Sequence, residues 1–276
     1  SQLGNQLFKI STALVTAWAH GATPIFPELQ GSEYNIPLNR KKIFFRLNAE
    51  DVPGVQWNHF GLQGFSGNFK VYYQPVHYQP NLYISGWNWQ TCYFDPYKDK
   101  LIDLFSPSEE EENEIHQGYG ELLKIKNLVG VHIRVYNPNS FYFLGLDYFK
   151  KAMDIFPDDY CFVIFSCRPD WVKERLEGYK PNMVFIKGND HVRDFFLLSK
   201  CKHKILSNST FSFWAAYLKN DPDQIVIAPD LYTPDIDRLS AMNGAYPKEW
   251  IVLKVPRLNQ QPADITNYST QSIHGG

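Results

Sequence analysis

The chain has 276 residues, and its 27 basic and 29 acidic side chains give a formal charge of −2 at pH 7. This balance argues against a general nucleic-acid-binding protein, which carries a basic excess, and no apolar run reaches the ~18 residues of a membrane span. Because 44% of the residues are hydrophobic and 16% are aromatic, a sizeable core is expected, and the disordered and fibrous classes are excluded. The chain starts at Ser1 rather than at a methionine, so we expect a trimmed sequence, and membrane association would need a segment that is missing here.

The first 126 residues hold two predicted helices around a long irregular stretch. Residues 5–20 have a strongly helical pattern, which Gly21 ends. Residues 31–98 are rich in aromatic residues, glycine and proline, and we interpret them as an irregular cap around a site. The sequence Ser106-Pro107-Ser108-Glu109 predicts the start of a linker helix, because a serine followed three residues later by glutamate is typical of a capping box. We therefore expect residues 1–126 to form one domain that ends with this helix.

The remainder of the chain, residues 127–276, alternates apolar β-branched runs with helical patterns. Strands are predicted at 128–133, 161–165, 183–186, 203–206 and 225–228, and helices at 147–156, 169–176, 190–201 and 210–218. Strands and helices that alternate at this spacing predict βαβ units and a parallel sheet. The fold class is therefore α/β.

Three segments have the chemistry of an anion site. Gly4-Asn5-Gln6 opens the first helix, where free backbone N–H groups can bind a phosphate, although Asn5 could equally be a plain helix cap. His132 and Arg134 share one face at the end of a predicted strand, where arginine can hold a diphosphate; a structural pair is the alternative. The stretch 207–212 follows a strand and opens a short helix, so it fits either an anion or sugar site or an ordinary serine and threonine cap.

Other patterns are less specific. The aromatic residues of the first half could stack on a sugar or fill the core; they are Trp57, Trp87, Trp89, Tyr93 and Phe94. The pairs Asp221/Asp223 and Asp235/Asp237 match a loose Asp-x-Asp metal pattern, which is also common in ordinary turns. The four cysteines do not have zinc-ligand spacing. We expect no metal site and no cofactor.

Taken together, several segments resemble the α-1,2-fucosyltransferases of glycosyltransferase family 11. LGNQLFKISTALVTAW at 3–18 is similar to the GLGNQLFQ start of that family, NLYISG at 81–86 to its middle segment, and VGVHIR at 129–134 to its VxxHxRRGD motif. LDYFKKA at 146–152 and FVIFS at 162–166 follow in the family's order. The most specific match is DFFLLSKCKHKILSNSTFSFWAAYL at 194–218, which resembles the signature DxxLMSxCxHxIxANSSFSWWGAWL along its whole length.

The resemblance implies a GT-B-like architecture of two Rossmann-like domains, with an acceptor-side domain at 1–126, truncated at its start, and a nucleotide-sugar-binding domain at 127–276. It implies inverting, metal-independent transfer of fucose from GDP-fucose to the 2-hydroxyl of a galactoside, with GDP-fucose as a substrate and a galactoside-containing glycan as the partner. The implied donor-binding residues are Gly4, Asn5, Gln6, His132, Arg134, Asp194, Asn208, Ser209, Thr210 and Ser212. The candidate acceptor-binding residues are Trp87 and Trp89.

The sequence departs from the family immediately after Arg134. The family motif continues with Arg-Gly-Asp, whereas Val135-Tyr136-Asn137 stand here. Asn137, in the position of the family's aspartate, can form hydrogen bonds but cannot accept a proton near neutral pH. Asp147 is then a candidate base, or else a helix cap. The departure leaves room for a related transferase with another nucleotide sugar, and for a protein that binds sugar or nucleotide without catalysis.

Overall fold

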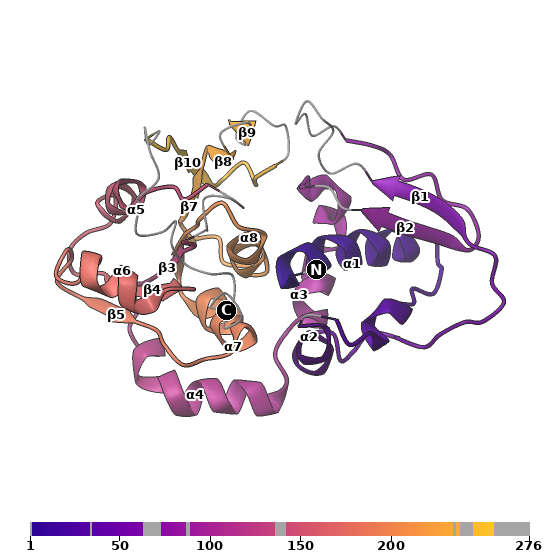
Figure 1. Cartoon of the computed structure of the whole chain (residues 1–276), viewed down its shortest axis with the longest axis horizontal. Helices are drawn as coiled ribbons and strands as arrows, with labels where there is room; N and C mark the ends of the chain where they lie inside the picture. Colours follow the sequence, from indigo (N-terminus) through magenta and orange to yellow (C-terminus); the bar gives the residue numbers. More distant parts are fainter. Residues whose placement is uncertain are drawn as a thin grey trace. The chain divides into compact units, whose positions relative to one another are not determined.

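The computed structural model describes residues 2–33, 35–62, 73–86, 89–135, 142–233, 236–237 and 245–256 (Figure 1). The chain forms two compact units: unit 1 contains Ser1–Ser108 and Ser240–Lys248, and unit 2 contains Glu109–Leu239 and Glu249–Gly276. None of the helices within the described ranges combines the length and apolar character that crossing a bilayer requires.

Unit 1 is built around its first helix and a two-stranded parallel sheet. Its elements are α1 (Leu3–Ala19), η1 (Pro27–Gln30), α2 (Ile36–Lys42), β1 (Asn58–Leu62), β2 (Leu82–Gly86), η2 (Thr91–Tyr93), η3 (Asp95–Tyr97) and α3 (Lys98–Leu104). The predicted helix at 5–20 is confirmed as α1. Its apolar residues are buried because they recur on one helical face, and Phe8 contacts Trp89 and Phe94 at ring-centroid distances of 5.8 Å.

A close backbone contact fixes the end of the β1–β2 sheet. Strand β1 pairs with β2 from Asn58↔Leu82 to Leu62↔Gly86. Gly86 has a φ of +73°, and a Cβ atom added there would lie 2.1 Å from the carbonyl oxygen of Leu62. Only glycine fits, since a side chain would clash with a backbone atom that is held in the sheet.

Unit 2 contains the parallel sheet that the sequence predicts. Its elements are α4 (Glu109–Leu123), β3 (Leu128–Ile133), α5 (Leu146–Met153), β4 (Cys161–Ser166), α6 (Pro169–Leu176), β5 (Met183–Phe185), α7 (His191–Lys200), β6 (His203–Ile205), α8 (Thr210–Tyr217), β7 (Val226–Pro229), β8 (Leu231–Thr233), β9 (Ile236–Asp237) and β10 (Ile251–Leu253). The sheet order is β10-β7-β6-β3-β4-β5, and all its pairs are parallel. Numbered from β3, this is the 3-2-1-4-5-6 order of a Rossmann sheet, which confirms the α/β class.

Helices pack against both faces of this sheet. On one face, Val129, Val131 and Ile133 of β3 join a buried cluster with α5 and α6. On the other face, Gly130 lies so close to α7 that a Cβ atom would meet Leu198 Cδ1 at 2.5 Å. Because side chains alternate along a strand, His132 points to the same face as Gly130, and its ring packs against Phe211 of α8.

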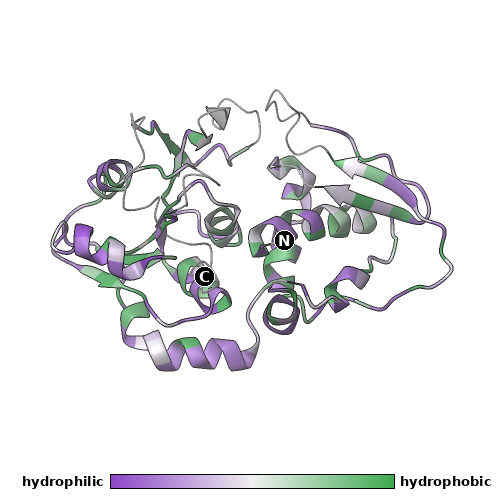
Figure 2. Cartoon of the chain, viewed as in Figure 1, coloured by the Kyte–Doolittle hydropathy of each residue, from purple (hydrophilic) through white to green (hydrophobic). Residues whose placement is uncertain are grey.

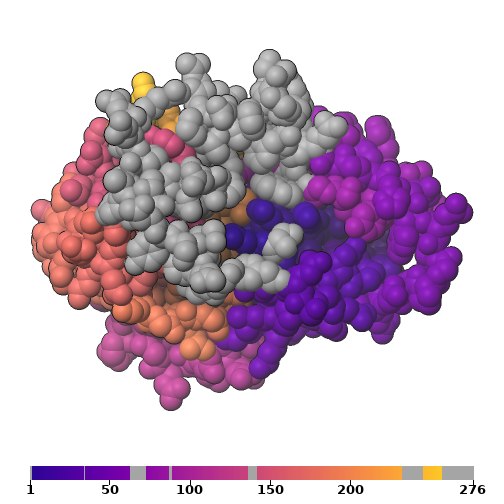
Figure 3. Space-filling model, viewed as in Figure 1, coloured from indigo at the N-terminus to yellow at the C-terminus, as the bar shows by residue number. Residues whose placement is uncertain are grey.

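The boundary between the units differs from the predicted one at residue 126, because the linker helix α4 belongs to unit 2. Ion pairs link Glu111 and Glu114 to Arg193, and Glu112 to Lys200 of α7 at 2.5 Å. The helix also starts at Glu109, two residues later than the proline suggested. Its remaining surface is largely hydrophilic and forms part of the exterior of unit 2 (Figures 2 and 3).

Replacing Gly86 should destabilise unit 1 strongly. We expect Gly86→Ala to lower the free energy of unfolding by at least ~2 kcal/mol, because it combines a left-handed backbone with a steric clash. In the same sheet, a Cβ at Gly61 would meet only Ser85 Oγ, at 3.6 Å, so Gly61→Ala should change stability by no more than ~0.5 kcal/mol. Chemical denaturation of both variants tests this, and equal effects would contradict the close contact.

Candidate functional site

The strand order reverses between β3 and β6, the position at which Rossmann sheets bind ligands beyond the carboxyl ends of their strands. His132 is the penultimate residue of β3, and Ser207 follows the end of β6 by two residues. The His132 Nδ1 atom is 2.8 Å from Ser207 Oγ. The sequence analysis included Ser207 in a polar stretch but gave it no role. The parallel pairing of β3 and β6 could have indicated a role for Ser207, because it brings the carboxyl ends of the two strands together.

His132 is an uncharged group in this environment. Its side chain is 6% exposed, and burial, with a further contribution from the positive charge of Arg134, lowers its pKa to about 3. A neutral imidazole can donate or accept hydrogen bonds, but it adds no charge. The positive charge at this edge of β3 therefore comes from Arg134, which is half-buried directly after the strand.

The residue after Arg134 is part of the hydrophobic core. Val135 is 4% exposed and belongs to the buried cluster of unit 2, and its carbonyl oxygen accepts a hydrogen bond from Cys167 Sγ at 3.5 Å. The chain is thus fixed immediately before residue 136. Asn137 lies outside the described residues.

Residues 207–212 form the N-terminal turn of α8. Ser209 caps this helix, since its side chain accepts a hydrogen bond from the Phe211 N–H at 3.3 Å, and Thr210 is its first residue. Asn208 Nδ2 donates to the carbonyl oxygen of Tyr142 at 2.8 Å, and Ser212 Oγ donates to that of Ser209 at 3.2 Å. The helix begins beside His132, so its partial positive charge acts at the same edge of the sheet.

Asp194 is hydrogen-bonded to Asn189, which in turn connects it to α4. Its Oδ1 accepts a hydrogen bond from Asn189 Nδ2 at 3.0 Å, and Asn189 in turn accepts one from the Tyr119 hydroxyl at 2.9 Å. Burial raises the pKa of Asp194 to about 6, the bond from Asn189 opposes this, and the charge of Asp190 adds to it. The described contacts of Asp194 thus connect α7 to α4.

The predicted anion site at the start of the chain lies in the first turn of α1. Because α1 begins at Leu3 and Gln2 precedes it, the helix includes Gly4, Asn5 and Gln6, and Asn5 is not its N-cap. The first turn of a helix is still where backbone N–H groups can bind an anion. Gln6 is buried, and its Oε1 accepts a hydrogen bond from Asn39 Nδ2 of α2 at 2.7 Å.

Of the remaining residues that the sequence analysis proposed for the site, one is in the core, one is on the surface and one lies outside the described residues. Trp89 is 1% exposed and packs on Phe8, so it is a core residue rather than a sugar platform; Trp87 lies outside the described residues. Asp147 is exposed in the first turn of α5, after Gly145 rather than at the cap.

The Asp-x-Asp pairs show no metal site in the described residues. The Asp221 Oδ1 atom accepts a hydrogen bond from the Asp223 N–H at 3.0 Å, which is an ordinary turn contact. Asp235 lies outside the described residues, and Asp237 ends β9. Within the ranges that the structure describes, no group of three histidine, cysteine, aspartate or glutamate side chains could hold a metal ion.

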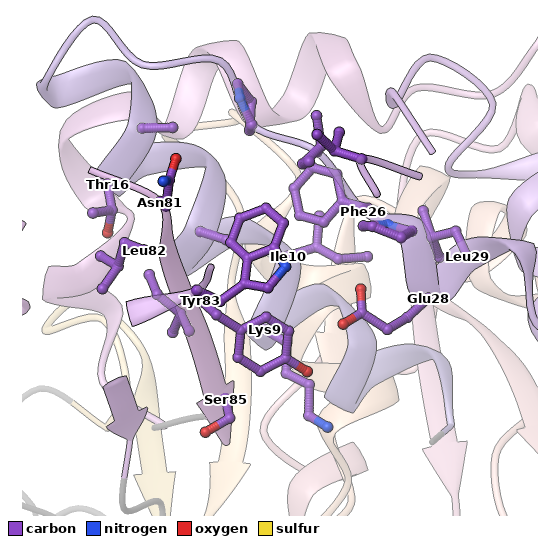
Figure 4. Close-up of a pocket in the computed structure, with 18 of the residues that line it drawn as sticks. Lys9, Ile10, Thr16, Phe26, Glu28, Leu29, Asn81, Leu82, Tyr83 and Ser85 are labelled. Carbon is purple, nitrogen blue, oxygen red and sulfur yellow. The ribbon is translucent and has the colours of Figure 1, made fainter. Parts of the chain in front are cut away.

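Unit 1 contains a cavity of about 820 Å³ between α1, η1 and the β1–β2 sheet (Figure 4). Its polar lining includes Lys9, Glu28, Tyr83 and Ser85, and its aromatic lining includes Trp57. The sequence analysis named Trp57 in an aromatic cluster but missed the others. Tyr83 and Ser85 lie on β2, which pairs in parallel with β1 across 19 intervening residues, and no local pattern indicates that pairing. Lys9 and Glu28 come from α1 and η1.

Comparison with known proteins places this geometry among glycosyltransferases. The family model described as Glycosyl transferase family 11 matches residues 67–254. The chain is 30% identical over 183 residues to an alpha-1,2-colitosyltransferase of Escherichia coli, covering 59% of this chain and 60% of that protein. It is 26% identical over 274 residues to galactoside alpha-(1,2)-fucosyltransferase 2 of Rattus norvegicus, covering 91% and 74%.

The fold resembles that of the fucosyltransferase NodZ from Bradyrhizobium, with a TM-score of 0.52 and 15% identity over 77% of this chain and 88% of NodZ. This similarity, together with the parallel sheets, confirms the expected GT-B-like fold. The chain spans about half to three fifths of the length of the first curated relatives that it matches.

The low pKa of His132 has a consequence for stability. An ordinary histidine has a pKa of 6.5, whereas His132 in the folded protein has a pKa of about 3. Between these values the unfolded chain binds a proton that the folded protein does not, so stability is complete above pH 6.5 and falls as the pH decreases. His203, with a pKa of about 4, adds to the same slope.

We expect His132→Gln to reduce the dependence of the unfolding free energy on pH between 6.5 and 4. His116→Gln, at an exposed position of α4, is the control and should keep the wild-type slope. Denaturant titrations at several pH values measure both slopes. An unchanged slope in His132→Gln would show that His132 is protonated normally in the folded protein.

Proposed function

Because the chain belongs to glycosyltransferase family 11, we propose that it transfers fucose from GDP-fucose to the 2-hydroxyl of a galactoside, with inversion. The observation that carries this proposal is the meeting of Arg134, the His132–Ser207 pair and the N-terminus of α8 at the strand-order reversal of a Rossmann sheet. This combination suits the diphosphate of a nucleotide sugar. A solved structure of NodZ, an alpha-1,6-fucosyltransferase, was co-crystallised with GDP, which supports the same donor chemistry.

In the proposed reaction, the acceptor hydroxyl oxygen attacks the anomeric carbon while the bond from that carbon to the β-phosphate oxygen breaks. GDP leaves with the bonding electrons, and the hydroxyl proton passes to a general base, for which Asp147 is the candidate from the sequence. Negative charge develops on the departing diphosphate, and a preorganised cation and helix dipole stabilise it most in the transition state. Arg134 supplies the cation and α8 the dipole. Neutral His132 orients the site through its bond to Ser207 and offers a hydrogen bond without competing for the phosphate charge.

Transfer of a sugar other than fucose is an alternative that specific observations favour. The relative with 30% identity is named as a colitosyltransferase, and the rat relative as a fucosyltransferase. This chain also has Val135-Tyr136-Asn137 in place of the Arg-Gly-Asp of the family motif. A protein that binds the nucleotide sugar without transferring it is the third possibility. Release of the nucleoside diphosphate from GDP-fucose and from other nucleotide sugars, with and without lactose, distinguishes the three.

Removing Arg134 should abolish transfer. We expect Arg134→Ala to lower kcat/KM at least ~10²-fold, the scale for loss of one preorganised charge donor, and to weaken GDP binding in a thermal-shift assay. Arg134→Lys should recover only part of the loss, because lysine keeps the charge but not the two-pronged geometry. Arg40→Ala, which removes an exposed arginine on α2, is the matched control. Wild-type kinetics in a folded Arg134→Ala would refute the assignment.

We also propose that transfer needs no divalent ion, because Arg134 and α8 provide positive charge at the diphosphate. Activity should therefore persist in excess EDTA. The opposite result, a loss that Mn²⁺ or Mg²⁺ restores, would assign the charge stabilisation to a metal and make Asp235 and Asp237 candidate ligands.

A further inference from the structure

The chain around Arg134 is held by two side chains at the end of the neighbouring strand. Ser166, the last residue of β4, donates a hydrogen bond from its Oγ to the carbonyl oxygen of Ile133 at 2.8 Å. Cys167, the next residue, donates from its Sγ to the carbonyl oxygen of Val135 at 3.5 Å. The two residues that flank Arg134 are therefore both bound to the end of β4, one by a hydroxyl and one by a thiol.

These two bonds begin where the strand pairing of β3 stops. In the described part of the sheet, the pairing of β3 with β6 ends at Val131↔Ile205, and its pairing with β4 ends at Ile133↔Ser166. Arg134 thus follows the last paired residue of β3 on both sides. Because the sheet ladders do not extend to it, the backbone at Arg134 depends on other contacts, and the hydroxyl and the thiol supply them.

The hydroxyl of Ser166 is oriented by a second hydrogen bond. Its oxygen accepts from the Arg168 N–H at 3.1 Å, while its proton is directed at the carbonyl oxygen of Ile133. A hydroxyl has one proton to donate, so Ser166 cannot donate to a substrate while this bond is present. Ser166 therefore bridges two backbone segments. The thiol of Cys167 is a weaker donor, so the hydroxyl is expected to contribute more to holding the chain.

The side chains of the flanking residues provide further anchors. Ile133 and Val135 are 0% and 4% exposed, and both belong to the buried cluster of unit 2. Each of these residues is thus held twice, by its side chain in the core and by its carbonyl oxygen at the end of β4. The backbone of Arg134, which lies between them, is fixed as a result. A cation stabilises developing charge best when it does not have to reorganise during the reaction.

We propose that Ser166 and Cys167 are positioning residues, which hold the backbone of Arg134 so that its guanidinium meets the diphosphate of the donor. The role of Arg134 rests on the proposed function, whereas the two hydrogen bonds do not. Neither side chain needs to contact the substrate, so their effect on the reaction passes through Arg134. The effect is measurable because small errors in the placement of a reacting or stabilising group can lower a rate by up to ~10²-fold.

Removal of the hydroxyl tests the bond to Ile133. We expect Ser166→Ala to lower kcat/KM for GDP-fucose about tenfold, and Ser166→Thr, which keeps the hydroxyl, to stay within about twofold of the wild type. Ser199→Ala is the matched control, because it removes a half-buried hydroxyl of α7 that donates to the carbonyl oxygen of Phe196 at 2.7 Å. It should leave kcat/KM unchanged. Equal effects of the two alanine variants, whether large or absent, would overturn the proposal.

Replacement of the thiol tests the bond to Val135. We expect Cys167→Ala to lower kcat/KM about threefold, since a thiol is a weak donor, and Cys167→Ser to recover most of this loss because it retains a donor. Cys92→Ala, at an exposed cysteine of unit 1, should behave as the wild type. Losses of the same size in Cys167→Ser and Cys167→Ala would contradict the role of this side chain as a hydrogen-bond donor.

A double-mutant cycle shows whether the effect passes through Arg134. The dissociation constant for GDP is measured by titration calorimetry for the wild type, Ser166→Ala, Arg134→Ala and the double variant, after thermal denaturation has shown that each is folded. Ser166→Ala should weaken GDP binding about fivefold when Arg134 is present and less than about 1.5-fold when it is replaced by alanine, because no guanidinium is left to position. Equal effects in the two backgrounds would reject the positioning role.

The GDP measurements also separate failure of this proposal from failure of the proposed function, since they do not require transfer. Coupling between Ser166 and Arg134 in a protein that transfers no fucose upholds the positioning role and rejects the transfer. Fucose transfer that depends on Arg134, but that neither Ser166→Ala nor Cys167→Ala alters, rejects the positioning role and upholds the transfer.

Discussion

The alternation of side chains along β3 determines both the packing of the helices on the sheet of unit 2 and the position of His132. Residues 129, 131 and 133 point to one face and fill the cluster with α5 and α6, so His132 must point to the other face, where α7 and α8 lie. The absence of a side chain at Gly130 lets α7 approach on that face, and His132 meets Ser207 there. A shift of one residue in the register of β3 would turn Arg134 towards the cluster with α5 and α6 and would move the apolar side chains to the face of α7 and α8. One strand therefore supplies core residues from one face and site residues from the other.

The burial of His132 and the position of Arg134 divide their chemical roles. Two cations side by side would repel each other, and the neutral imidazole avoids this because burial costs its protonated form more than it costs the neutral one. The bond to Ser207 fixes the ring, and Phe211 covers it at a centroid distance of 5.1 Å. The positive charge at this edge of the sheet is thereby concentrated on Arg134 and the α8 terminus.

Local signals predicted unit 2 well and unit 1 poorly. The buried strands of unit 2 are short apolar runs that the sequence shows directly. Asp190 caps α7 at the first residue of the predicted helix 190–201, and its side chain accepts hydrogen bonds from the N–H groups of Val192 and Arg193 at 2.9 Å. The start of α1 could not be placed, because Gln2 gives no cap signal and Asn5 gives a misleading one. The hydrogen bond between Tyr83 and Glu28 joins residues 55 positions apart in the chain. Trp89 is buried and Trp57 is half-buried because of tertiary packing, which the amino-acid composition cannot predict.

The burial of Val135 determines what the second arginine of the family motif would cost in this chain. The family has a second arginine at this position, whereas the present side chain is 4% exposed among apolar neighbours. An arginine introduced there would have to bring its guanidinium into the core, at a cost of several kcal/mol, or pull the end of β3 out of register. Val135 therefore fixes the end of β3 against the core. A second cation beside Arg134 would be accommodated at lower cost on another loop than at residue 135.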